Sequence, residues 1–226
     1  MPQGSYLTMA PRGRLLSTYL FDLDGTLINS IELIMSSFRH TMLVHLGEVP
    51  ADHEWRSGFG TPLRTQLAKF ACDTEQADAM RATFVEYSDK HHDRMVEVYP
   101  GVREALENLC AREAVRLAIV TSKNRGGTRR GLQLCGLEQY FDVFVTADDV
   151  DKYKPDPAPV IAALDQLAVG ASEAVFIGDS PHDIAAGRSA GVQTAAVLWG
   201  PFTRQALAHQ PPDHWLMCPA DINTLS

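Results

Sequence analysis

Carboxylates at short spacings are the first residues of this sequence that could do chemistry. Asp22 and Asp24 stand two residues apart, and Asp179 and Asp183 form a second acidic pair far along the chain. Several carboxylates brought together repel one another, and this repulsion predicts a divalent cation among them. Because the set contains oxygen ligands and no Cys or His, it favours a hard ion, and the predicted cofactor is Mg²⁺.

Hydroxyl and ammonium groups complete a set that could transfer a phosphoryl group. Thr121 and Ser122 follow one apolar run, and Lys154 lies in a loop before Pro155. Phosphoryl transfer needs a nucleophile, neutralisation of the phosphate oxygens and a group that handles the proton of the leaving oxygen. We expect Lys154 to supply a positive point charge for the phosphate. We also expect one of the two hydroxyls to bind phosphate, and Thr121 is preferred over Ser122.

Short apolar runs stand directly before most of these residues and predict the elements that position them. Such runs, bounded by turn signals, are typical of buried strands, and helical patterns lie between them. The alternation predicts an α/β fold with a Rossmann-like parallel sheet and helices on both faces, whose ligands bind beyond the carboxyl ends of the strands. The predicted strands are 15–21, 115–120, 143–146, 174–177 and 194–198, and the predicted helices are 102–110, 128–134, 159–167 and 184–190.

One region interrupts the alternation with helical patterns and no convincing strand. It predicts helices over 31–46, 63–70 and 77–95, with a loop at 58–62. We therefore expect an all-helical cap, residues 30–97, inserted into a core made of residues 1–29 and 98–226.

The segment Asp22-Leu23-Asp24-Gly25-Thr26, with Thr121, Lys154 and Asp179 at later loop positions, resembles the motifs of the haloacid dehalogenase superfamily. The resemblance spans nearly the whole chain and is to the phosphatases of that superfamily with a helical C1 cap. It implies that Asp22 is a nucleophile that forms an aspartyl-phosphate. It implies that Asp24 is first the general acid for the leaving oxygen and then the base for water.

The same resemblance implies the remaining roles. Thr121 would hold the phosphate, and Lys154 would be the lysine of the third motif. The metal would be bound by Asp22, Asp179 and the backbone carbonyl of Asp24. Asp183 would lie near the metal or pair with Lys154. Supporting positions are Asp183, Gly25, Thr26 and Ser122.

The resemblance also implies that the cap closes over the site and selects the leaving group. The loop at 58–62 and the residue shortly after it are the candidates for substrate contact, namely Phe59, Thr61 and Arg64. The favoured activity is hydrolysis of a small phosphomonoester, similar to that of a phosphoglycolate phosphatase. The alternatives are an inorganic pyrophosphatase, a phosphomutase of the β-phosphoglucomutase type, and a binding protein that retains the fold.

Composition limits the partners. The formal net charge of −8 makes nucleic acids and anionic membranes poor partners, so the expected partner is a small phosphorylated metabolite. No apolar run reaches the roughly 18 residues of a membrane span. Residues 1–14 have the pattern of an irregular N-terminal tail and not that of a signal peptide. The four cysteines have no CxxC spacing and are expected to be reduced and mostly buried. We expect the protein to be cytoplasmic, and to be a monomer or a homodimer.

Overall fold

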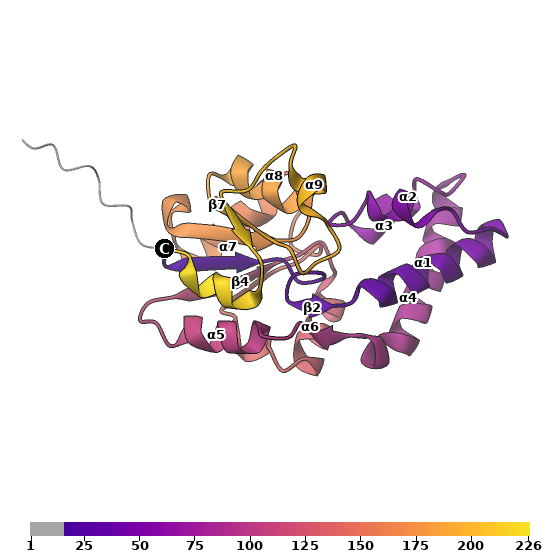
Figure 1. The fold of residues 1–226 in the computed structure, drawn as a ribbon. Coiled ribbons are helices and arrows are strands. Elements are labelled where there is room, and N and C mark those ends of the chain that lie inside the picture. The colour runs from indigo at the N-terminus through magenta and orange to yellow at the C-terminus, as the bar shows by residue number, and fades with distance from the viewer. Residues whose placement is uncertain (1–15) are drawn as a thin grey trace, which may run out of the picture.

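A parallel sheet forms the centre of the molecule (Figure 1). The structure, a computed structural model, describes residues 16–226, so the predicted tail and Leu15 lie outside the described residues. Within that range the strand order is β5-β4-β1-β6-β7-β8, with every neighbouring pair parallel, which confirms the predicted α/β fold. The strands are β1 (Thr18–Phe21), β4 (Arg116–Val120), β5 (Val143–Val145), β6 (Ala174–Gly178), β7 (Gln193–Val197) and β8 (His214–Leu216).

Side chains of the central strand alternate between two cores, one on each face of the sheet. Tyr19 and Phe21 of β1 belong to one core, which α5 and α6 cover. Leu20 belongs to the other, which α7 and α8 cover. Both faces are thus buried, as the near-continuous apolar runs of the strands require. These helices are α5 (Val102–Cys110), α6 (Arg125–Leu134), α7 (Ala158–Leu167) and α8 (Pro181–Ala190).

The chain between β1 and β4 forms helices that lie apart from the sheet, at one end of the molecule (Figure 1). They have an apolar core of their own, in which the rings of Phe38 and Trp55 stack with centroids 4.3 Å apart. The arrangement suits the expected cap, although its boundaries at residues 30 and 97 stay a prediction. The helices are α1 (Ile31–Leu46), α2 (Asp52–Arg56), α3 (Leu63–Leu67) and α4 (Thr74–Met95).

The two connections between these helices and the sheet are joined to each other. β2 (Ile28–Asn29) and β3 (Glu97–Val98) pair as a short antiparallel ladder. The backbone N–H of Tyr99 extends it by donating to the carbonyl of Leu27 at 3.1 Å. The outgoing and returning chains therefore run side by side.

The predicted elements agree with the structure best where the apolar pattern is long. The helices at 31–46 and 102–110 begin and end where predicted. α4 begins three residues early, at Thr74, because the side chain of Asp73 caps it by accepting from the N–H of Gln76. Elements that were not predicted are α2, α9 (Arg204–Leu207), β2, β3, β8 and the 3₁₀ helices Glu138–Tyr140, Ala171–Glu173 and Pro219–Thr224.

The expectation that the cysteines are mostly buried is wrong. All four cysteines are free, but only Cys135 is buried; Cys72, Cys110 and Cys218 are exposed because they lie at or beyond the ends of elements that face solvent.

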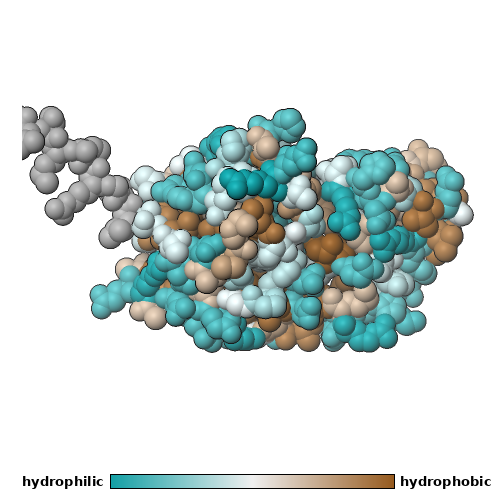
Figure 2. All heavy atoms as spheres, in the orientation of Figure 1, coloured by the Kyte–Doolittle hydropathy of each residue, from teal (hydrophilic) through white to brown (hydrophobic). Residues whose placement is uncertain are grey.

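Figure 2 shows hydrophilic residues spread over both the sheet and the helical end of the visible face. Among residues 16–226 no helix combines the length and apolar character that crossing a bilayer requires. The cytoplasmic location and the monomer or homodimer stay predictions.

Candidate active site

Asp22 lies immediately beyond β1, one of the two central strands of the sheet, and its carboxylate is buried. The ammonium of Lys154 donates to its Oδ1 at 2.7 Å. Within residues 16–226 no donor reaches the other oxygen, Oδ2. Burial raises the pKa of Asp22 to about 7, with Lys154 opposing and Asp183 adding to the rise. Asp22 thus has one oxygen fixed and one free to react.

Lys154 bridges two carboxylates in the interior. Its Nζ also donates to Oδ1 of Asp183 at 2.6 Å, and its own side chain is only 1% exposed. Burial would lower the pKa of Lys154, but Asp183 and Asp22 outweigh it and raise the pKa above its ordinary value. The other oxygen of Asp183 accepts from Ser180, the N-cap of α8, at 2.6 Å. Asp183 thus pairs with Lys154, one of the two positions that the resemblance implied for it.

Three buried carboxylates meet at the ends of β1 and β6. One oxygen each from Asp22, Asp179 and Asp183 lies within 4.8 Å of the other two. Burial, Asp183 and Asp22 raise the pKa of Asp179 well above its ordinary value. Lys154 supplies one positive charge against these three carboxylates, so the donor set fits a hard divalent cation. The side chain of Asp24 is not among the three.

Asp24 faces the cavity from the other side. Lys123 donates to both of its carboxylate oxygens, at 2.9 and 3.2 Å, and Ser30 also donates to Oδ1. Burial opposes ionisation, but Lys123 and Ser30 outweigh it and hold the pKa of Asp24 below its ordinary value. In this arrangement Asp24 is a carboxylate, and it must exchange these partners for a proton before it can act as an acid.

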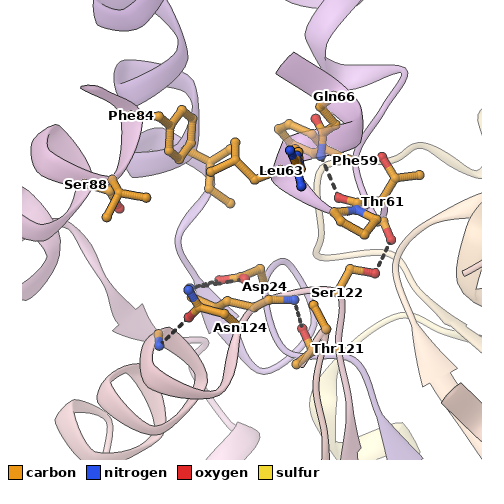
Figure 3. Close-up of a pocket in the computed structure, with 18 of the residues that line it drawn as sticks. Asp24, Phe59, Thr61, Leu63, Gln66, Phe84, Ser88, Thr121, Ser122 and Asn124 are labelled. Atoms are coloured by element: carbon orange, nitrogen blue, oxygen red, sulfur yellow. Dashed lines mark hydrogen bonds and ion pairs between the residues drawn. The ribbon is translucent and has the colours of Figure 1, made fainter. Parts of the chain in front are cut away.

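The two candidate hydroxyls have different surroundings. Thr121 follows β4, is 5% exposed, and accepts at Oγ1 from the backbone N–H of Lys123 at 3.2 Å. Ser122 instead donates to the carbonyl of Gly60, at 2.6 Å, in the helical insertion (Figure 3). The hydroxyl of Thr121 can therefore donate its proton to a ligand, whereas the hydroxyl of Ser122 is bonded to the loop at residues 58–62.

The supporting residues pack the turn after β1 against the end of β6. Thr26 donates to Oδ1 of Asp179 at 3.2 Å, and the indole of Trp199 donates to the carbonyl of Thr26 at 2.9 Å. A Cβ at Gly25 would stand 3.0 Å from the Asp179 carboxyl group. A side chain at position 25 would thus displace a candidate metal ligand.

The helical insertion covers the strand ends and encloses a cavity of about 970 Å³. Phe59, Thr61 and Arg64 line it, as do Asp22, Asp24, Thr121, Lys154 and Asp179. Thr61 donates to the carbonyl of Gly58, and Arg64 is exposed and pairs with Asp78. The three predicted substrate residues reach the cavity, but none of them forms a hydrogen bond or ion pair with the buried carboxylates.

Two cavity residues were missed by sequence reasoning. Lys123 directly follows the hydroxyl pair, and its position at a strand end was the signal that could have found it. His92, near the end of α4, gave no such signal, since an isolated histidine on a helix carries no motif. His182, at the start of α8, is half-buried beside Gly60, because the loop of the insertion packs on the start of that helix.

Comparisons with known proteins identify similar sequences. A model of the family described as "Haloacid dehalogenase-like hydrolase" matches residues 19–197. The chain is 38% identical to the pyrophosphatase PpaX of Halalkalibacterium halodurans over 207 residues, which covers 92% of this chain and 95% of that protein. It is 39% identical to a pyrophosphatase PpaX of Bacillus cereus, with 92% and 94% covered.

Solved structures share the fold. A Lactobacillus plantarum protein named "putative phosphoglycolate phosphatase" superposes with a TM-score of 0.83 at 28% identity, covering 94% of this chain and all of that one. A haloacid dehalogenase-like hydrolase of Bacteroides fragilis gives 0.84 at 25% identity, covering 92% and 99%. Similarity in sequence and in structure thus extends over the core and the helical insertion together.

Proposed function

Because the chain belongs to the haloacid dehalogenase-like hydrolase family, we propose that it is a Mg²⁺-dependent phosphatase that attacks a small phosphate monoester with Asp22. The observation that carries the proposal is the environment of that carboxylate. Lys154 fixes one oxygen of Asp22 at 2.7 Å and leaves the other open toward the cavity. A nucleophile needs both this orientation and this access.

The residues of the site suit each stage of hydrolysis. Oδ2 of Asp22 attacks phosphorus, and the bond from phosphorus to the leaving oxygen breaks. Asp24, once protonated, gives that oxygen its proton. Asp24 then takes a proton from water, which attacks the phosphorus of the aspartyl-phosphate, releases inorganic phosphate and restores Asp22. Thr121 and Lys154 bind and orient the phosphate oxygens during both stages.

Asp22, Asp179 and Asp183 surround the place where Mg²⁺ would be held, with the carbonyl of Asp24 as a further ligand. Bound there, the ion would offset the repulsion between carboxylates and phosphate and stabilise charge on the phosphate oxygens. Asp183 shares its charge with Lys154 and therefore orients the lysine as well.

Pyrophosphate is a second candidate substrate. The relatives named pyrophosphatase PpaX are 38% and 39% identical over nine-tenths of the chain. Lys123 and Arg130 also line the cavity and could face a second phosphate if they left their aspartate partners. The same nucleophile serves either substrate, because only the leaving group differs.

Release of inorganic phosphate tests the proposal. Phosphoglycolate, pyrophosphate and a set of alkyl and sugar phosphates are supplied with Mg²⁺, and a parallel series contains EDTA. We expect turnover that EDTA abolishes and that Asp22→Asn lowers by roughly a thousandfold or more. Asp165→Asn, on the exposed face of α7, is the matched control and should keep full activity. Turnover that survives Asp22→Asn would contradict the mechanism.

A further inference from the structure

Beyond the paired linkers, two groups of contacts join the helical insertion to the core. One is at the loop of residues 58–62, where Ser122 donates to the carbonyl of Gly60 and the ring of Phe59 meets that of Phe202. The other is between α4 of the insertion and α6 of the core, which lie side by side (Figure 1). Charged side chains form this second contact, so it is the one that can respond to the conditions in solution.

Arg130 makes the contact between α4 and α6. Its Nε donates to Oδ1 of Asp93 at 3.1 Å, and its Nη1 donates to Oδ1 of Asp89 at 3.2 Å. Its Nη2 donates to the backbone carbonyl of Asp89 at 3.1 Å and lies 3.0 Å from Oδ1 of Asp93. The two aspartates are four residues apart, so they lie on neighbouring turns of one face of α4. The planar fork of one arginine thus holds two turns of the facing helix.

Within residues 16–226, Arg130 makes every ion pair between the insertion and the core. Other charged side chains of the two parts pair within their own part. Lys123 pairs with Asp24 in the core, and Arg39 pairs with Asp52 in the insertion. Attachment of the insertion by ion pairs therefore depends on one side chain of the core.

The residue after Arg130 shows how closely α6 approaches the base of the insertion. A Cβ at Gly131 would stand 3.0 Å from Cδ1 of Ile28 in β2 and 3.9 Å from Nε2 of His92 in α4. α6 therefore touches an outgoing linker and the last turns of α4 at once. An ion pair at this place fixes the angle at which α4 stands on the core.

The ion pairs of Arg130 are exposed, so they can break without unfolding the protein. The side chains of Arg130, Asp89 and Asp93 are 38%, 66% and 63% exposed. An exposed ion pair changes an equilibrium constant by about fivefold at most, and salt weakens it. This is too little to hold a fold together. It is enough to shift the balance between two positions of an insertion that has an apolar core of its own.

We propose that Arg130, Asp89 and Asp93 form a clasp that holds the helical insertion in the position seen in this structure, and that the insertion tilts away from the core when the clasp breaks. Arg130 and Asp89 line the cavity, so this tilt widens the cavity on the side of α4 and α6. The clasp thus sets how much of the time the cavity is open to solvent. The inference concerns movement and does not depend on Asp22 being the nucleophile.

Native cysteines supply the probes for a test. Cys72 precedes α4 in the insertion, Cys110 and Cys218 belong to the core, and all three are exposed, whereas Cys135 is buried. α4 has 22 residues and is about 33 Å long, so a tilt of about 10° about its C-terminal end would move Cys72 by about 6 Å. Nitroxide labels on Cys72 and Cys218 in Cys110→Ser, and on Cys72 and Cys110 in Cys218→Ser, give two distances by double electron–electron resonance.

Breaking the clasp from either side should populate a second set of distances. We expect Arg130→Gln to raise the ratio of displaced to native distances about two- to tenfold at about 10 mM KCl, because two exposed ion pairs are lost. Asp89→Asn combined with Asp93→Asn should have the same effect. Arg130→Lys keeps the charge and should restore part of the native population.

Salt tests the clasp without any change at Arg130. Raising KCl to about 0.5 M screens exposed ion pairs, so the protein with an intact clasp should shift toward the displaced distances. The Arg130→Gln protein has no such pairs left and should respond much less. Distances that do not change with salt in the protein with an intact clasp would overturn the inference.

Arg129→Gln is the matched control. Arg129 is the neighbouring arginine on α6, but it pairs with Glu138 inside the core, so its loss should leave both distances unchanged. An equal shift in Arg129→Gln and Arg130→Gln would overturn the inference in favour of a general effect on α6. If Arg130→Gln lowers the thermal midpoint, the salt series on the protein with an intact clasp decides the question. The measurement uses no substrate, so failure of the proposed phosphatase activity would leave its result intact.

Discussion

At the scale of single residues, Lys154 sets the charge of the site. It is buried, yet Asp183 and Asp22 raise its pKa above the ordinary value, so it remains an ammonium group between two carboxylates. Removing one partner of such a buried pair costs about 3–5 kcal/mol in typical proteins. The lysine therefore orients Asp22, the proposed nucleophile, and also makes the burial of its carboxylate tolerable.

Metal binding should depend on pH through the same carboxylates. The pKa of Asp22 is raised from 3.8 to about 7, so between these values the metal-free folded protein binds more protons than the unfolded chain. Its stability therefore falls as pH rises through this window, and the ionised site gains most from a cation. We expect Mg²⁺ to raise the thermal midpoint more at about pH 8 than at about pH 5.5. KCl at equal ionic strength is the control, and a larger Mg²⁺ shift at the lower pH would contradict this reasoning.

Lys123 should control when Asp24 can be an acid. Because Lys123 holds the pKa of Asp24 below its ordinary value, Lys123→Met should raise that pKa. The proposed mechanism needs protonated Asp24 at its first stage, so the alkaline fall of kcat/KM should move to higher pH in the variant. Lys152→Met removes an exposed lysine that pairs with Asp156 and should leave the pH profile in place. A shift of the alkaline fall to lower pH in Lys123→Met would show that Lys123 does not set the pKa of Asp24.

The sequence predicted which core residues converge because each follows a strand, and parallel strands end at one edge of the sheet. Asp22, Thr121 and Asp179 follow β1, β4 and β6, which are neighbours in the sheet. The pairing of Lys123 with Asp24 spans 99 residues and depends on the path of the chain after β4, which no local pattern encodes. His92 was missed because an isolated histidine on a helix carries no motif.

At the scale of elements, the loop between α2 and α3 decides how the cap meets the core. Gly60 has a φ of +91°, and a Cβ there would lie 2.7 Å from Oγ of Ser180. Its carbonyl accepts from Ser122, and the neighbouring Phe59 ring meets Phe202 edge-on, with centroids 6.4 Å apart. The loop can approach this closely only where residue 60 has no side chain.

Gly60→Ala should therefore lower activity more than it lowers stability. Gly47, at the end of α1, also has a positive φ, but a Cβ there meets nothing within 4 Å. Both alanine variants carry a backbone cost of about 1–2 kcal/mol, so Gly47→Ala is the matched control for strain alone. We expect kcat/KM to fall at least tenfold in Gly60→Ala and to stay near wild type in Gly47→Ala, measured by phosphate release beside thermal unfolding. Equal losses in the two variants would mean that the loop contact is unimportant.

Element prediction succeeded where a periodic apolar face was long, as in α1 and α5. It failed for α2 and β8, which have five and three residues and are too short to show a period. The pair β2 and β3 has two residues in each strand, and only the packing of the two connections brings them together. Short elements of this kind are determined by tertiary contacts more than by local sequence.

At the scale of the whole molecule, charge should influence how substrate arrives. The net charge of −8 repels an anionic phosphate at long range, and salt screens that repulsion. We expect kcat/KM for a dianionic monoester to rise about twofold as ionic strength increases from about 10 to about 100 mM at saturating Mg²⁺, with kcat unchanged. A steady decrease over this range would indicate that attraction by local cations outweighs the charge of the molecule.

The short ladder of β2 and β3 has a mechanical consequence. Two independent linkers would let the helical end twist, tilt and slide relative to the sheet. Because the ladder binds the two linkers together at Ile28 and Val98, bending at this single place is the easiest movement left. We therefore expect the helical insertion to move relative to the sheet as one body, with the two paired linkers as its common pivot.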